Sequence, residues 1–345
     1  MKRALTVFLS VCMLAFGAAA FAACGEEVDA DKVTLQTLTG ESDVVAVLQK
    51  AANDKTEAYG VLGEPSLTNG QTAVPSIGIE IDFQEEWKNI TGYEGYPQAS
   101  LIARSSFAQE HSTFIEAFSA ALKDNAQWLA DESNVEKFED ALDAYNAAHE
   151  GEYQTTLAGN TYTAETIKRC NLGYQSAAEV KASVLDYVQR LNGTTLDDGF
   201  FYVPSASASE QTDGDTQAET VDIYLPDGTP ALAMAKVFAE GVDIAGYTVE
   251  FHIVQASQIG SIFSSTEADL AIMPTIGAAT VYGKAGNIRL VSTNVFGNLY
   301  IAGVNGTVNS LEDLKGKTVC TTAATTIQLL QYILTKNGIE YTGLV

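Results

Sequence analysis

The residue types that most often carry out catalysis are scarce in this sequence and follow no known catalytic pattern. Three histidines are present, His111, His149 and His252, and the chain contains no HExxH, no GxSxG and no GxxxxGK(S/T) segment. His252 falls in an alternating, strand-like segment and the other two fall near expected helix ends, so we predict structural or surface roles for all three. The sequence therefore predicts no catalytic residue and no enzyme.

Cysteine usage leads to the same conclusion. Cys12 and Cys24 lie near the N-terminus, whereas Cys170 and Cys320 are far apart in the chain and belong to no CxxC pair. No segment resembles a calcium-binding loop. We predict no metal, no redox centre and no cofactor, and we interpret Cys170 and Cys320 as buried free thiols, although a disulfide is allowed in an exported protein.

The N-terminal segment indicates the cellular compartment. Two basic residues precede the apolar run Leu5 to Phe21, which is short for a membrane span and ends in small residues, as in a signal peptide. The following FAACG segment resembles a bacterial lipobox, whose cysteine is lipidated and becomes the new N-terminus. This resemblance predicts lipidation of Cys24 and anchoring at the outer face of the cytoplasmic membrane. The alternatives are ordinary secretory cleavage before Cys24, or a retained anchor helix.

The charge balance argues against one class of partner. The chain has 19 Lys and Arg against 44 Asp and Glu, a formal net charge of −25. Removal of the signal peptide with its two basic residues makes this −27. Phosphate binding needs a basic face, so we expect no nucleic acid partner. Acidity of this kind is typical of a solvated surface.

The elements that must position a binding site are clearest after residue 220. Apolar residues alternate from 221 to 225 as in a strand, a turn follows at Asp227 and Gly228, and Thr229 is placed to cap a helix. Strands alternating with helices predict a mainly parallel sheet, in which ligands bind beyond the carboxyl ends of the strands. Further strands are expected at 248–254, 269–273, 288–292 and 299–304.

Two expected helix N-termini offer unpaired N–H groups to a ligand. They lie at Thr229 and between Thr321 and Thr326. Each would favour an anion or a polar oxygen by about 0.3–1 kcal/mol through the helix dipole. The mature chain, with 46% hydrophobic residues over the full sequence, is long enough for two lobes with separate cores. A polar, Ser-rich segment at 192–220 predicts a flexible linker.

Four segments resemble one family, the solute-binding proteins of ABC importers for nitrate, sulfonates, taurine and thiamine precursors. The segments are 221–232 (VDIYLPDGTPAL), 268–274 (ADLAIMP), 296–300 (FGNLY) and 310–319 (SLEDLKGKTV). The resemblance covers nearly all of the mature chain except the linker. It implies a two-lobe, periplasmic-binding-protein-like α/β fold of type II, each lobe a mainly parallel sheet flanked by helices. It also implies an ABC permease and ATPase as partners, and a monomer.

The resembling segments stand in a circularly permuted order. Segment 310–319 normally opens the second lobe, yet the chain stops at Val345, and residues 59–65 resemble the strand and loop that should follow. A fragment or a mis-assembled tandem gene is the alternative. The predicted divisions are a signal peptide (1–23), a lipidated tether (24–30), the first part of lobe 2 (31–92), a hinge crossing with the C-terminal part of lobe 1 (93–191), the linker (192–220), the first part of lobe 1 with a hinge crossing (221–305) and the remainder of lobe 2 (306–345).

The resemblance implies that the lobes close around a small solute and deliver it to the importer. Alternatives are a binding protein that signals to a membrane receptor, and an enzyme of thiamine-pyrimidine or menaquinone-precursor type. Helix N-termini suit a sulfonate, carboxylate or nitrate, whereas Glu64 favours a neutral or cationic, pyrimidine-like compound. The predicted ligand contacts are Glu64, Tyr96, Asp227, Gly228, Thr229, Ser257, Pro274, Thr275, Asn298, Thr321, Thr322 and Thr325.

Overall fold

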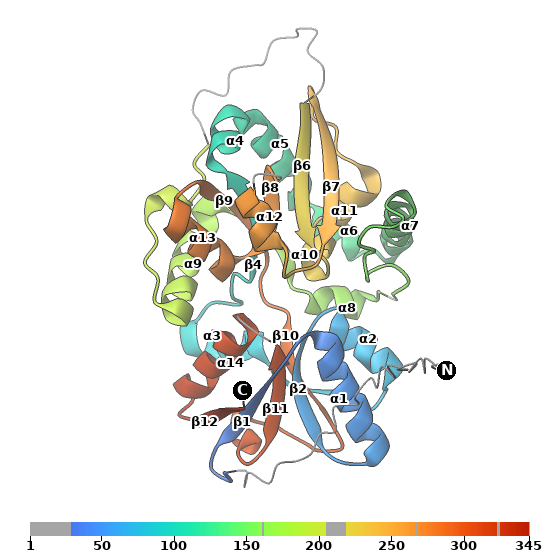
Figure 1. The fold of residues 1–345 in the computed structure, drawn as a ribbon, viewed down its shortest axis with the longest axis vertical. Coiled ribbons are helices and arrows are strands. Elements are labelled where there is room, and N and C mark those ends of the chain that lie inside the picture. The colour runs from blue at the N-terminus through green and yellow to red at the C-terminus, as the bar shows by residue number, and fades with distance from the viewer. Residues whose placement is uncertain (1–28, 161, 205–218, 266–267, 323–324, 345) are drawn as a thin grey trace, which may run out of the picture.

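A computed structural model describes residues 29–344 apart from residue 161 and segments 205–218, 266–267 and 323–324. The predicted signal peptide and the lipidation site Cys24 lie outside these residues. Within the described part of the chain, no helix is long and apolar enough to cross a membrane. The described residues form two α/β lobes, one above the other in Figure 1, each built on a six-stranded sheet.

The sheet of lobe 2 joins segments from both ends of the chain. Its strand order is β12-β1-β11-β2-β10-β3, and β1 lies between β11 and β12 with parallel pairing on both sides. The prediction that the front and back of the chain share one sheet is thereby confirmed. The strands are β1 (Val33–Leu38), β2 (Ala58–Gly63), β3 (Gly78–Asp82), β10 (Leu299–Val304), β11 (Thr318–Thr322) and β12 (Tyr341–Leu344).

The sheet of lobe 1 has the order β5-β9-β4-β8-β6-β7. The prediction of a mainly parallel sheet is wrong here, because β4 pairs antiparallel with both neighbours and β5 pairs antiparallel with β9. β4 runs antiparallel because it enters lobe 1 from lobe 2. Its direction is therefore opposite to that of its neighbours β8 and β9. The strands are β4 (Ala99–Arg104), β5 (Leu172–Ser176), β6 (Glu219–Pro226), β7 (Tyr247–Val254), β8 (Leu270–Pro274) and β9 (Ile288–Val295).

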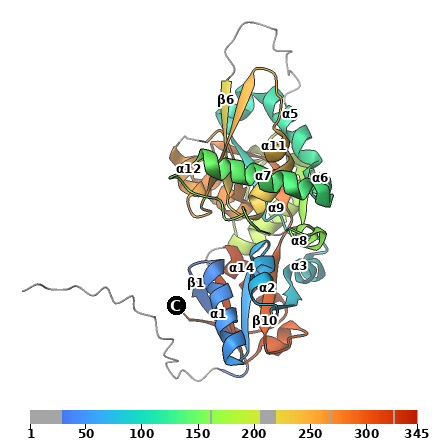
Figure 2. The same ribbon diagram turned by 90° about the vertical axis from the view of Figure 1, so that its right-hand side faces the viewer.

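Helices cover both faces of each sheet (Figures 1 and 2). In lobe 2, α1 and α2 pack on one face and α3 and α14 on the other. In lobe 1, α9, α12 and α13 pack on one face and α4 to α8, α10 and α11 on the other. The helices are α1 (Glu41–Asp54), α2 (Ser66–Ala73), α3 (Phe83–Thr91), α4 (Ser105–Glu110), α5 (Ser112–Lys123), α6 (Asn125–Leu129), α7 (Glu132–Ala148), α8 (Ala164–Arg169), α9 (Ala177–Asn192), α10 (Thr229–Leu232), α11 (Ala235–Glu240), α12 (Ile259–Ser265), α13 (Thr275–Ala285) and α14 (Thr325–Lys336).

Local signals explain several of these boundaries. The Asp82 side chain accepts from the backbone of the first turn of α3, and the helix ends at Gly92, whose φ is 82°. A capping box of Ser176 and Glu179 begins α9. The predicted helix at Thr229 is instead two short helices, α10 and α11, and its N-cap is Gly228, with no side-chain cap.

Part of the predicted linker is packed against lobe 1. Phe200 and Phe201 are 0% and 5% exposed, and Phe201 bridges to Leu290 of β9. The expectation of a flexible linker therefore does not hold for residues 196–202, because Leu196, Phe200 and Phe201 are buried and the two aromatic residues contact α13 and β9. Residues 205–218 of the linker lie outside the described residues.

Two segments cross between the lobes. Residues 92–98 lead from α3 to β4, and residues 296–298 lead from β9 to β10. Both lie in segments that were predicted to contain a crossing. The predicted lobe 1 segment 221–305 extends too far, because its last strand, β10, belongs to the sheet of lobe 2. The crossings touch closely: a Cβ added at Gly95 would lie 2.3 Å from the Phe296 carbonyl oxygen.

We predict that Gly95→Ala destabilises the protein by about 1–3 kcal/mol, because the added methyl group must push the two crossings apart. The matched control is Gly277→Ala within α13, where the nearest atom to the new Cβ is 3.9 Å away. That variant should be neutral or gain up to about 1 kcal/mol. Urea unfolding of both proteins is the measurement, and equal stabilities would contradict the close approach.

Candidate functional site

Three predicted contact residues meet where the lobes touch. Glu64 follows β2 in lobe 2, Thr229 begins α10 in lobe 1, and Asn298 lies in the second crossing. Asn298 Nδ2 donates to the Glu64 main-chain oxygen at 2.8 Å and to Thr229 Oγ1 at 2.6 Å, and the Thr229 hydroxyl also donates to that main-chain oxygen. All three residues are buried. We call these residues, together with Gln98 and Arg169 described below, the interlobe polar cluster.

Gln98 ties the first crossing to the second. Its Nε2 donates to Asn298 Oδ1 at 2.7 Å, and the Asn298 backbone N–H donates to Gln98 Oε1 at 3.0 Å. The Gln98 carbonyl accepts from the backbone N–H of Thr275 at 3.0 Å. Gln98 was not predicted as a site residue. The sequence signal that could have identified Gln98 is its position two residues after Tyr96, inside the predicted crossing.

An ion pair joins the lobes beside these amides. Arg169, at the end of α8, donates from Nε to Glu64 Oε1 at 2.5 Å, and Thr68 Oγ1 donates to the same oxygen at 3.0 Å. The Glu64 side chain is 0% exposed and that of Arg169 is 17% exposed. A carboxylate this deeply buried needs a paired charge and hydrogen bonds, and it has both. No sequence spacing links Arg169 to Glu64, so sequence analysis missed Arg169.

Burial also affects the ionisable groups next to this cluster. Burial raises the pKa of the Cys170 thiol far above its usual value, although a hydrogen bond with Thr229 acts in the opposite direction. Burial likewise raises the pKa of Glu41, whose Oε1 accepts from the Gly63 backbone N–H at 2.8 Å. A pKa raised by burial favours the protonated thiol, which is a weaker nucleophile than the thiolate.

Tyr96 packs in an aromatic contact on the other side of the crossings. Its ring stacks on Tyr187 of α9 with centroids 5.8 Å apart, and its hydroxyl donates to Gln84 Oε1 at 2.9 Å. Trp87 of α3 lies 5.4 Å from Tyr187, edge to face, so this contact also joins the lobes. Within the described residues, Trp87 Nε1 and the Tyr187 hydroxyl are buried without a hydrogen-bond partner.

Asp227 and Gly228 have structural roles in this conformation. The Asp227 carboxylate accepts from the hydroxyls of Tyr153, Thr155 and Thr156 and from the Thr156 backbone N–H, at 2.6–2.9 Å. It thereby fixes the segment after α7 against the loop that leads to Thr229. Gly228 has a φ of 115°, which a residue with a side chain rarely adopts.

The remaining predicted residues are separate from the interlobe polar cluster, apart from the Thr275 backbone contact. Thr275 is fully buried, with its hydroxyl 2.8 Å from Ser100 Oγ, and Ser257 lies in an exposed turn before α12. The other four lie at the ends of elements that border the junction: Pro274 at the end of β8, Thr321 and Thr322 at the end of β11, and Thr325 at the start of α14.

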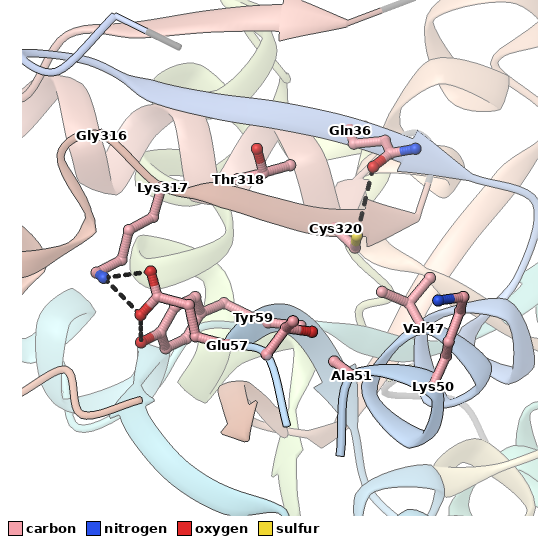
Figure 3. Close-up of a pocket in the computed structure, with 12 residues that line it drawn as sticks. Gln36, Val47, Lys50, Ala51, Glu57, Tyr59, Gly316, Lys317, Thr318 and Cys320 are labelled. Carbon is pink, nitrogen blue, oxygen red and sulfur yellow. Dashed lines mark hydrogen bonds and ion pairs between the residues drawn. The ribbon is translucent and has the colours of Figure 1, made fainter. Parts of the chain in front are cut away.

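Two hollows lie elsewhere on the surface of the described residues. One of about 400 Å³ lies near the amino ends of β2 and β11, away from the lobe junction (Figure 3). Its charged groups are paired, because Lys317 Nζ contacts the Glu57 carboxylate at 2.9 Å and holds the pKa of Glu57 below its usual value. The second, of about 490 Å³, lies between α7, α11 and β7.

Comparison with known proteins adds no assignment: no protein-family model and no curated protein matches this chain.

We predict that Arg169→Ala lowers the free energy of unfolding by about 3–5 kcal/mol, because it leaves the Glu64 carboxylate buried without a counter-charge. Adding Glu64→Gln should recover part of the loss, since it removes that unpaired charge. Lys50→Ala is the control, because its pair with Asp54 is exposed and is worth less than about 1 kcal/mol. If Arg169→Ala costs no more than this control, the buried ion pair is not formed in solution.

We also predict that Cys170 and Cys320 resist alkylation in the folded protein at pH 8. Both are buried and free, and burial raises the pKa of Cys320 to about 11. A Cys24→Ser variant reports on these thiols alone once the signal peptide is removed. Iodoacetamide should modify both in urea and neither rapidly in buffer, as read by intact mass. Rapid modification without denaturant would contradict the described burial.

Proposed function

We propose that this chain is an exported, lipid-anchored solute-binding protein of the nitrate, sulfonate, taurine and thiamine-precursor type, in a circularly permuted order. It binds a small solute between its lobes and delivers it to an ABC permease and ATPase. The observation that carries the proposal is the meeting of Glu64, Thr229 and Asn298 across the lobe junction. These residues come from three distant segments, each identified as a candidate contact from sequence alone.

The arrangement of the lobes supports this mechanism. Two short crossings lie side by side, so rotation about them separates Glu64 in lobe 2 from Thr229 and Arg169 in lobe 1. A solute that contacts both lobes shifts the equilibrium toward a closed state by its difference in affinity for the two states. The importer then recognises the closed form.

The charges at the junction favour a neutral or zwitterionic organic solute. Glu64 and Arg169 neutralise each other, and the remaining groups are amides and hydroxyls that both donate and accept. α10 has only four residues, so its dipole offers little to a bare oxyanion.

A thermal-shift screen of sulfonates, nitrate, pyrimidines, amines and amino acids tests the proposal. A solute at one hundred times its dissociation constant should stabilise the protein by about 2.7 kcal/mol. Thr229→Val should weaken that solute's binding by at least about tenfold, because it removes a hydroxyl within the cluster. Thr229→Ser keeps the hydroxyl and is the matched control. A cooperatively melting protein that no solute shifts would contradict the proposal, as would equal binding by the two variants.

A further inference from the structure

Three side chains of metal-ligating type lie together on the outer strands of the lobe 1 sheet. Asp222 is on β6, and Glu250 and His252 are on the edge strand β7. The parallel register sets Asp222 opposite Glu250, and His252 follows two residues later, so all three side chains lie on one face of the sheet. One ligand atom from each lies within 4.8 Å of the others.

The contacts of these residues leave donor atoms available. His252 Nε2 lies 2.7 Å from Asp222 Oδ1, and the imidazole stacks on the Tyr224 ring with centroids 4.4 Å apart. The side chains of His252 and Asp222 are 29% and 34% exposed. Glu250 is exposed, so an ion reaches these side chains directly from solvent.

Negative charge accumulates at this position. In the described part of the chain, neither Asp222 nor Glu250 forms an ion pair with Lys or Arg. A third carboxylate is adjacent, because Asp269 Oδ2 accepts from the Asp222 backbone N–H at 3.0 Å. Arg104 and His111 act electrostatically on Asp269, so the described carboxylates without a Lys or Arg partner here are Asp222 and Glu250, and their charge favours a divalent cation.

We propose that Asp222, Glu250 and His252 bind one divalent first-row transition-metal ion, such as Zn²⁺, through one nitrogen and two oxygen donors. With zinc-to-donor bonds of about 2.0–2.2 Å, two donors on a tetrahedral ion lie about 3.3–3.6 Å apart. Rotation of the exposed Glu250 side chain by about an ångström brings its carboxylate into this range. His252 Nε2 exchanges its hydrogen bond with Asp222 for the metal, and water completes the coordination sphere.

The donor set also predicts which ions bind. Imidazole suits zinc, copper and nickel, whereas magnesium and calcium prefer oxygen ligands alone. The ion bridges β6 to the edge strand β7. It lies on the outer strands of lobe 1 and involves none of the interlobe polar cluster, so this site is independent of the solute-binding proposal.

The test is calorimetric titration of Zn²⁺ into tag-free protein, with excess Mg²⁺ present to occupy exposed carboxylates. We expect one site per chain. His252→Gln and Asp222→Asn should each weaken it at least about tenfold, and Glu250→Gln should weaken it measurably. His111→Gln is the matched control, because His111 lies 3.5 Å from a single carboxylate, that of Glu219. It should leave the affinity unchanged.

Two further measurements keep the outcomes distinct. Unfolding of each variant in EDTA shows whether the fold persists, so that lost binding is not mistaken for lost structure. Co²⁺ in place of Zn²⁺ should give visible ligand-field bands that disappear in His252→Gln. The proposal is overturned if the folded protein binds no Zn²⁺ in the presence of Mg²⁺, or if His252→Gln and Asp222→Asn bind it as tightly as the parent.

Discussion

The insertion of β1 between β11 and β12 is the constraint on which the rest of lobe 2 depends. Val33 to Leu38 have no neighbouring strand close in sequence, so this ladder forms only when the two ends of the chain meet. Such long-range closure is entropically costly, and the apolar contacts of α14 and α3 on the same sheet help to offset that cost. The carboxyl ends of β1, β11 and β2 then all point to lobe 1, which sets Glu64 and Thr322 at the junction.

Two contacts with different chemistry hold the lobes together on opposite sides of the crossings. The aromatic contact of Trp87, Tyr96 and Tyr187 extends an apolar cluster from one lobe into the other. The interlobe polar cluster relies on directional hydrogen bonds, which weaken steeply with distance and angle. Rotation of one lobe therefore breaks the polar contact sharply, whereas apolar packing tolerates small shifts. In the proposed lobe closure, the aromatic side is therefore the better pivot.

Local periodicity predicted elements well and their assembly less well. The strands predicted at 248–254 and 299–304 match β7 and β10, because each segment is rich in β-branched and aromatic residues. α2 was not predicted, because Gly70 and the polar residues around it leave no clear apolar pattern for its buried face. The antiparallel strands of lobe 1 and the ion pair of Arg169 depend on tertiary placement, which no spacing encodes. The same holds for Asp222 and His252, which strand register brings together although the sequence predicted no metal site.

The hydrogen bonds already formed at the junction limit the free energy that a bound solute can gain there. In this conformation Thr229 and Asn298 satisfy each other and the Glu64 carbonyl, so a solute that merely replaces these bonds gains about as much as it loses. The buried N–H of Trp87 and hydroxyl of Tyr187 differ, because each lacks a partner among the described residues. An unsatisfied buried donor costs about 1–3 kcal/mol, which a bound water recovers by accepting from it. In the proposed function, net affinity comes from lobe closure, and Thr229 and Asn298 select the solute by shape and polarity.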